Sequence, residues 1–136
     1  MDDVILNKAA IVERCVQRVR HVYADDPSNL TTDLTRQDSI VLNLQRACEA
    51  AIDLAMHLVR RYQLGIPQES RDAFDLLVTS GRLDADLGER LKRMVGFRNV
   101  AVHDYTRLNL DIVRSIIEHR LDELIAFSAV AIRTGA

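Results

Sequence analysis

The sequence predicts an all-α fold, an up-and-down bundle of four main helices plus one short helix. Apolar residues recur at helical spacing along almost the whole chain, and no segment combines alternation at period two with β-branched enrichment. The 136 residues contain no linker rich in Pro, Gly or Ser. We therefore expect a single domain over residues 1–136, whose core is aliphatic because aromatic residues make up only 4% of the chain.

The first two helices are predicted by apolar stripes that end in turn-forming residues. The first covers roughly residues 2–24 and ends before the turn formers at 25–29. The second begins where Thr35 and Asp38 resemble a capping box, and it continues to about Tyr62. Its stripe alternates in steps of four and three, as the inward face of a helix requires: Ile40, Leu44, Ala47, Ala51, Leu54, Leu58 and Tyr62.

The remaining helices are predicted from their caps. Ser70 is the expected N-cap of the short helix, and Gly81 is expected at the left-handed position that closes it. Asp84 is the expected N-cap of the next helix, which carries the chain to Arg98. Asn109 is the last expected N-cap, and it starts a single helix that runs almost to the C-terminus.

Charge and cysteine content exclude several classes of protein. A formal net charge of -2 argues against indiscriminate coating of nucleic acid, so any RNA site requires a local basic patch. Cys15 and Cys48 lie far apart, without a cluster at zinc spacing, which predicts reduced thiols and no structural metal. No apolar stretch is long enough to span a membrane, and we expect a cytoplasmic protein.

The segment 96–105 gathers an unusual set of polar side chains. An arginine such as Arg98 can hold a phosphate through its planar fork, and a histidine such as His103 can move protons near neutral pH. Five helical residues turn by about 140°, so these two side chains do not share a helix face. We expect the helix to end near Asp104, which would let His103 and Tyr105 fold back towards Arg98.

This segment resembles the Arg-x4-His-x-Tyr signature of the HepT toxins, which belong to the HEPN (higher eukaryote and prokaryote nucleotide-binding) superfamily. The resemblance extends in order and spacing over nearly the whole domain. The matching residues are Ala51–Leu54, His57, Leu58, Gly65–Pro67, Phe74, Leu76, Leu77, Gly81, Met94–Asn99 and His103–Tyr105. The resemblance implies an HEPN-like helical fold and a metal-independent endoribonuclease, the toxin of a two-gene toxin–antitoxin module.

The resemblance also implies roles for single residues. Arg98 and His103 map onto the catalytic pair, the first as an electrostatic stabiliser and the second as general acid or base, while Asn99 maps onto a supporting position beside the substrate. No metal and no other cofactor is implied, since RNA supplies its own 2′-hydroxyl nucleophile. Members of the superfamily dimerise with two motifs facing one cleft, so a homodimer is expected.

The partners that the resemblance implies are RNA, either tRNA or mRNA, and an MntA-like minimal nucleotidyltransferase that acts as the antitoxin. This enzyme would attach AMP to Tyr105 and thereby silence the toxin. Two other functions stay open: a non-catalytic HEPN module that binds nucleotide or RNA or accompanies a nucleotidyltransferase, and a purely structural dimerisation protein. The presence of both Arg98 and His103 favours the nuclease.

The other polar residues have ordinary structural interpretations. Asp53 and His57 lie one turn apart and would form half a metal site, but no second pair supplies the remaining ligands, so a carboxylate that orients a buried imidazole is favoured. Arg60 and Arg61 are expected to interact with the dipole at a helix end, with contact to an RNA backbone as the alternative. We expect the two remaining histidines on the surface, and these are His21 and His119.

Overall fold

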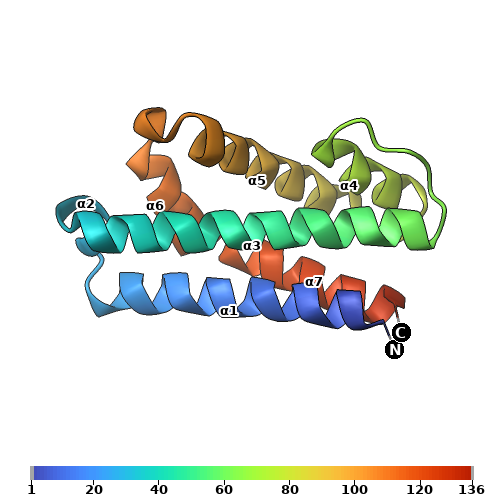
Figure 1. Cartoon of the computed structure of the whole chain (residues 1–136), viewed down its shortest axis with the longest axis horizontal. Helices are drawn as coiled ribbons and strands as arrows, with labels where there is room; N and C mark the ends of the chain where they lie inside the picture. Colours follow the sequence, from blue (N-terminus) through green and yellow to red (C-terminus); the bar gives the residue numbers. More distant parts are fainter. Residues whose placement is uncertain (1, 136) are drawn as a thin grey trace.

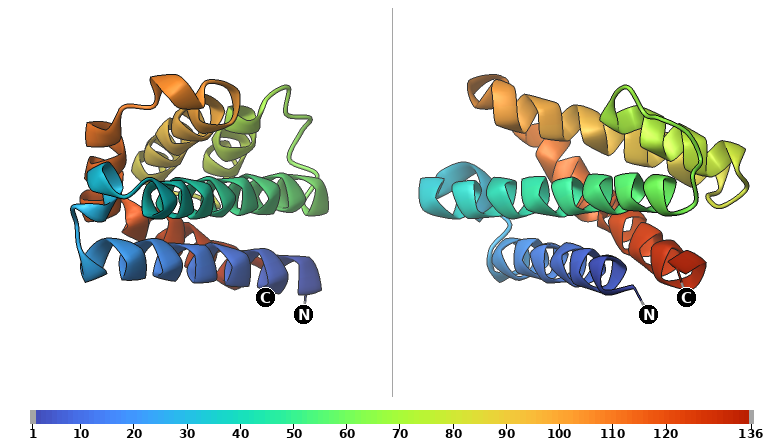
Figure 2. Two further views of the ribbon diagram at one scale, coloured as in Figure 1. Left: turned by 60° about the vertical axis from the view of Figure 1, so that its left-hand side comes forward. Right: turned by 45° about the vertical axis from the view of Figure 1, so that its right-hand side comes forward.

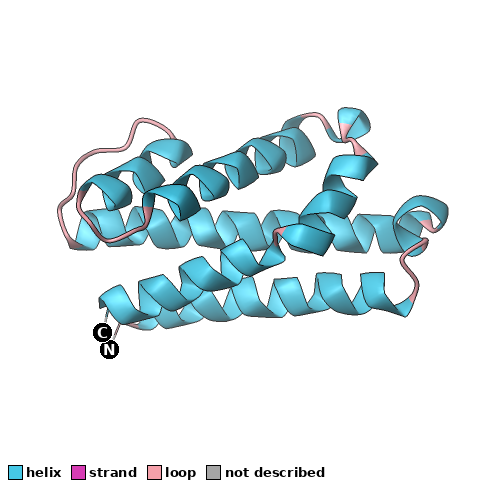
Figure 3. Cartoon of the chain, turned by 180° about the vertical axis from the view of Figure 1, so that it is seen from behind, coloured by secondary structure: helices cyan, strands magenta, loops and turns pink. Residues whose placement is uncertain are grey.

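The computed structural model describes residues 2–135, and within them the chain is helical without any β-strand. Four helices, α1, α3, α5 and α7, run up and down beside one another, while α4 is short (Figures 1 and 3). The all-α bundle predicted from the sequence is confirmed. The helices are α1 (Asp3–Asp25), α2 (Asn29–Thr32), α3 (Leu34–Arg61), α4 (Ser70–Thr79), α5 (Ala85–His103), α6 (Leu110–His119) and α7 (Leu121–Gly135), with a 3-10 turn η1 (Tyr105–Arg107).

Helix α3 is the centre of the bundle, because α1, α2, α4, α5 and α7 all pack against it (Figure 2). Its predicted inward stripe is buried from Ile40 to Leu58, and Tyr62 is half-buried. The core is aliphatic as expected, with one aromatic pair: Phe74 and Phe127 meet edge to face with ring centroids 5.4 Å apart. Burial of these apolar side chains is the main force that holds the helices together.

Three of the predicted helix boundaries are confirmed. The Asp84 carboxylate accepts a hydrogen bond from the backbone N–H of Leu87 (3.1 Å), and the Asn109 amide oxygen accepts one from that of Asp111 (2.9 Å). Gly81 has a φ of +80°, the left-handed conformation expected just after the end of α4.

Two predicted N-caps are wrong, one by two residues and one by a single residue. Asp33 caps α3 by accepting a hydrogen bond from the backbone N–H of Arg36 (3.1 Å), so the Thr35–Asp38 capping box does not exist. Helix α4 begins one residue earlier than predicted, after Glu69, where Asp72 accepts from the backbone N–H of that residue (3.1 Å). Asp38 and Ser70 therefore lie inside helices, and their side chains are available for other contacts.

The single C-terminal helix predicted from Asn109 is wrong, because it is two helices joined at Arg120. Arg120 has a φ of -127°, outside the helical range, and the buried carboxylate of Glu123 accepts a hydrogen bond from its guanidinium (3.3 Å). The bend, visible in Figure 3, directs α6 against α1 and α2 while α7 runs along α1 and α3. The short α2, which lies between the first two predicted helices, was also missed.

The two chain ends meet at one end of the bundle (Figure 1). The Asp2 carboxylate caps α1 and also binds His57 Nε2 (2.6 Å) and Arg61 (2.9 Å), whose guanidinium in turn donates to the carbonyl of Gly135 (3.1 Å). The hydrogen bond from His57 is the largest cause that lowers the pKa of Asp2 to about 2. The carboxylate beside His57 is therefore Asp2 and not Asp53. Asp53 pairs with Lys8 instead.

Cys15 and Cys48 are both buried and unpaired. His21 and His119 are exposed, as expected. No helix within residues 2–135 has the length and apolar character needed to cross a bilayer.

Candidate active site

The polar motif lies on the C-terminal half of α5. The buried face of this helix, which includes Leu91, Met94, Val95 and Ala101, fixes its rotation in the bundle. Arg98 and Asn99 are half-buried beside that face, and His103, the last helical residue, is exposed. The motif therefore occupies the C-terminal half of α5, just before the η1 turn.

Arg98 lies where α3, α4 and α5 meet. Its Nη2 donates a hydrogen bond to Ser70 Oγ in α4 (3.2 Å), while its Nε is buried without a hydrogen-bond partner among residues 2–135. Its positive charge also acts on Cys48 in α3: burial raises the pKa of that thiol to about 12, and the guanidinium opposes the rise. Because the Nε is closed to solvent, the donors left for an anion such as a phosphate are those of Nη1, which makes no hydrogen bond within residues 2–135.

His103 does not fold back towards Arg98, contrary to the prediction. It continues the helix, and Asp104 after it still donates its backbone N–H to the carbonyl of Val100 (2.8 Å). The imidazole is exposed and makes no hydrogen bond within residues 2–135. Because about 140° of helix rotation separates the two side chains, one chain does not aim them at the same point.

The helix end predicted near Asp104 is confirmed, and Tyr105 begins the η1 turn that follows it. Its hydroxyl donates a hydrogen bond to Asp38 Oδ1 in α3 (2.6 Å), although the residue remains 40% exposed. The pKa of Tyr105 is raised to about 12. Partial burial is the largest cause, and the hydrogen bond to Asp38 is the second. The phenol is therefore protonated at neutral pH and accessible from solvent.

Sequence reasoning missed Ser70 and Asp38, the side chains that accept hydrogen bonds from Arg98 and Tyr105. Both had been interpreted as helix caps, because Ser and Asp favour that position. Their contacts with Arg98 and Tyr105 join residues 28 and 67 positions apart, so no local signal identifies them. The side-chain amide of Asn99 makes no hydrogen bond within residues 2–135 and is half-buried.

No group of three or more His, Cys, Asp or Glu side chains among residues 2–135 is arranged to hold a metal ion. Positive charge near the motif comes instead from arginine. Arg93 and Arg107 are exposed, and Arg107 pairs with Asp104 (3.3 Å).

The up-and-down bundle carries Arg98 and His103 on the C-terminal half of α5 and Tyr105 in the turn after it, as expected from the sequence resemblance to HEPN proteins. A family model described as "Ribonuclease HepT-like" matches residues 12–131. The chain therefore belongs to the HepT-like family of ribonucleases.

Individual relatives agree with this assignment. The chain is 51% identical over 127 residues to the mRNA nuclease HepT of Shewanella oneidensis, covering 93% of this chain and 95% of the relative. It is 27% identical over 109 residues to a putative RNase of Archaeoglobus fulgidus, covering 78% and 81%. Its structure resembles the tri-AMPylated HEPN toxin of Shewanella oneidensis in complex with an MNT antitoxin, with a TM-score of 0.92, 50% identity, and coverage of 98% and 99%.

Proposed function

We propose that this protein is the toxin of a toxin–antitoxin module, an endoribonuclease that cleaves RNA without a metal ion. The observation that carries the proposal is the position of Arg98 and His103. The first has unused hydrogen-bond donors at a helix junction, the second is an exposed imidazole, and both lie on one helix of a HepT-like ribonuclease. The Shewanella relative is an mRNA nuclease, which favours mRNA as the substrate and the cytoplasm as the place of action.

The chemistry follows from these two side chains. The RNA 2′-hydroxyl attacks the adjacent phosphorus, and the bond to the leaving 5′-oxygen breaks. Arg98 stabilises the charge that develops on the phosphate oxygens, and His103 transfers a proton, either from the nucleophile or to the leaving oxygen. The different helix faces of the two residues favour a two-fold dimer, in which a second copy supplies the imidazole that one chain does not aim at its own arginine. Asn99 supports the substrate beside them.

Tyr105 is the site of regulation in this proposal. A nucleotidyltransferase antitoxin attaches AMP to its exposed hydroxyl, and the added negative charge repels an RNA phosphate near Arg98. The Shewanella structure, an AMP-modified toxin bound to an MNT antitoxin, supports a partner of this kind.

The proposal is tested with purified protein and RNA in the presence of EDTA. Cleavage is expected to persist and to leave a 2′,3′-cyclic phosphate and a 5′-hydroxyl, which mass spectrometry of the fragments identifies. Incubation with the nucleotidyltransferase and ATP is expected to add the mass of AMP at Tyr105 and to stop cleavage, while a Tyr105→Phe variant stays active. Cleavage that requires added metal, or a modified protein that still cleaves, would contradict the proposal.

A further inference from the structure

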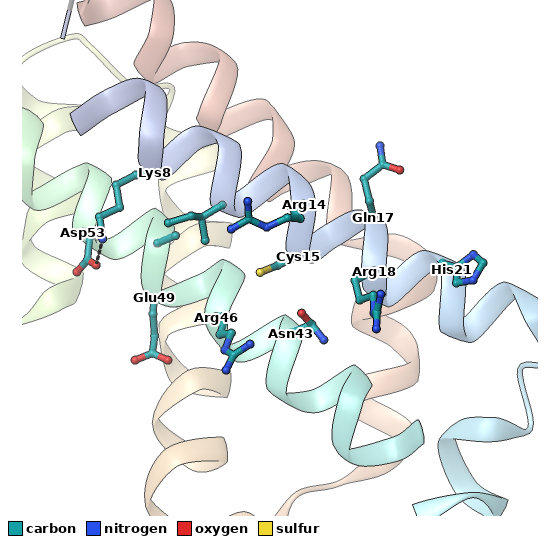
Figure 4. Close-up of a pocket in the computed structure, with 12 residues that line it drawn as sticks. Lys8, Arg14, Cys15, Gln17, Arg18, His21, Asn43, Arg46, Glu49 and Asp53 are labelled. Atoms are coloured by element: carbon teal, nitrogen blue, oxygen red, sulfur yellow. Dashed lines mark hydrogen bonds and ion pairs between the residues drawn. The ribbon is translucent and has the colours of Figure 1, made fainter. Parts of the chain in front are cut away.

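A groove of about 920 Å³ lies between α1 and α3 (Figure 4). Two acidic side chains of α3, Glu49 and Asp53, also line it, but its walls are richer in positive charge. Helix α1 contributes most of it and α3 contributes one arginine, and these basic side chains are Lys8, Arg14, Arg18, His21 and Arg46. The active site described above uses none of these residues.

Most of this positive charge is not neutralised within the chain. Lys8 pairs with Asp53 at 3.0 Å. By contrast, Arg14, Arg18 and Arg46 form no ion pair with any carboxylate among residues 2–135. The groove therefore concentrates positive charge in a chain whose formal net charge is -2.

Two of these arginines converge on one point from opposite walls. Burial raises the pKa of the Cys15 thiol on the groove floor, and the positive charges of Arg14 and Arg46 both oppose that rise. Figure 4 shows the two guanidinium groups on either side of this thiol, with the amide of Asn43 nearby. Like charges that face each other across a groove are best accommodated by an anion between them.

The spacing and chemistry of the groove fit a nucleic-acid backbone better than a protein. Arg14, Arg18 and His21 follow one face of α1 in steps of four and three, so the two arginines lie about 6 Å apart along the helix axis, comparable with the step between phosphates of an extended strand. The apolar residues of the lining are small or medium-sized, namely Ile11, Cys15 and Ala50, and none is aromatic. A protein partner requires larger apolar or aromatic anchors.

We propose that this groove binds the phosphate backbone of single-stranded RNA away from the bond that is cleaved. The inference rests on the proposed ribonuclease function and adds a second contact surface to it. Such contacts increase affinity and position the strand without reading its bases. The groove should therefore lower KM for long RNA and leave kcat for very short substrates unchanged.

The test compares two double variants that remove the same charge. Arg14→Gln with Arg46→Gln changes the groove, whereas Arg20→Gln with Arg133→Gln changes exposed arginines elsewhere. Binding of a fluorescent RNA of about 20 nucleotides is measured against salt in a His103→Ala background, which prevents cleavage. The groove variant is expected to bind about tenfold more weakly, with a salt slope lower by about 1.4, since each phosphate contact on a single strand contributes about 0.7.

The outcomes separate this proposal from the proposed function. Cleavage of a dinucleotide, too short to span both sites, should be unchanged in the groove variant that retains His103, which also shows that it is folded. Equal RNA affinity for the two double variants would overturn the groove proposal, and so would loss of the nucleotidyltransferase complex with unchanged RNA binding. If the wild type cleaves no RNA, the ribonuclease proposal fails, while the binding comparison still reports on the groove.

Outside the groove, the hydroxyl of Tyr105 donates a hydrogen bond to Asp38. The carboxylate accepts the proton of an exposed hydroxyl at 2.6 Å, and no helix cap requires Asp38, since Asp33 occupies that position. Because the pKa of Tyr105 is about 12, hardly any phenolate exists at neutral pH, and a reaction at this oxygen needs a proton acceptor.

We infer that Asp38 is the general base for AMP transfer to Tyr105. The inference rests on the proposed modification. The Tyr105 oxygen attacks the α-phosphorus of ATP held by the nucleotidyltransferase, the bond from that phosphorus to the bridging oxygen of the β-phosphate breaks, and pyrophosphate leaves. The phenolic proton passes to the Asp38 carboxylate. An aspartate plays the same part towards substrate hydroxyls in protein kinases.

The decisive variant is Asp38→Asn, which keeps an acceptor oxygen for the hydroxyl but loses basicity. The rate of AMP incorporation is expected to fall about 10²-fold, Asp38→Glu should recover part of it, and Asp111→Asn, an exposed acid on α6, should react like the wild type. RNA cleavage by unmodified Asp38→Asn protein should be unchanged. A wild-type rate for Asp38→Asn would overturn the inference and leave Asp38 a positioning role, whereas a wild type that accepts no AMP contradicts the proposed function instead.

Discussion

Replacing Arg98 with alanine is expected to reduce RNA cleavage at least about 10²-fold, because the variant loses the guanidinium that stabilises charge in the transition state. Arg98→Lys keeps the positive charge but not the planar fork, and we expect it to recover only part of the rate. The measurement is the initial rate of RNA cleavage in EDTA at saturating RNA. Circular dichroism of each variant checks that the bundle is intact.

The matching change in the second proposed catalytic residue is His103→Ala. The rate of RNA cleavage is expected to fall by about 10² to 10⁴. The imidazole of His103 is exposed and makes no hydrogen bond within residues 2–135. Its removal should therefore leave the free energy of unfolding unchanged. His119→Ala removes another exposed histidine at a helix end and serves as the matched control. Cleavage that survives both Arg98→Ala and His103→Ala would place the chemistry elsewhere in the protein.

The largest effect on stability is expected from Phe127→Ala. The Phe127 ring is fully buried in α7 and meets Phe74 edge to face, and its removal leaves a cavity at the centre of the bundle. The free energy of unfolding should fall by about 3–5 kcal/mol, a large part of the total for a domain of this size. Urea unfolding followed by circular dichroism measures the change, since the chain contains no Trp.

Ile132→Ala is the control for that experiment, because Ile132 lies on the same helix but is 40% exposed. It should cost less than about 1 kcal/mol. A cost for Phe127→Ala as small as this would show that the core closes around the missing ring, or that the α7 packing differs from that described above.

The sequence by itself determined the all-α fold, the main helices of the bundle and the position of the Arg98–Tyr105 motif along the chain. Apolar spacing predicted the inward face of α3, and the local chemistry of Asp84, Gly81 and Asn109 predicted where helices start or stop. These signals are readable because a helix stripe repeats every three or four residues and a cap acts within three residues of itself. The resemblance to the HepT toxins likewise rests on a short continuous run, and membership of the ribonuclease family confirms it.

Only the tertiary structure decided what that motif contacts. The apolar stripe of the last helix continues through Arg120 at unchanged spacing, so the bend that separates α6 from α7 depends on packing against other helices. Ser70 and Asp38 look like caps in the sequence, yet they bind Arg98 and Tyr105. The groove likewise forms only where Arg46 of α3 meets α1. The physical reason is the same in each case: these contacts join residues distant in sequence, and folding alone brings them within hydrogen-bonding or Coulombic range.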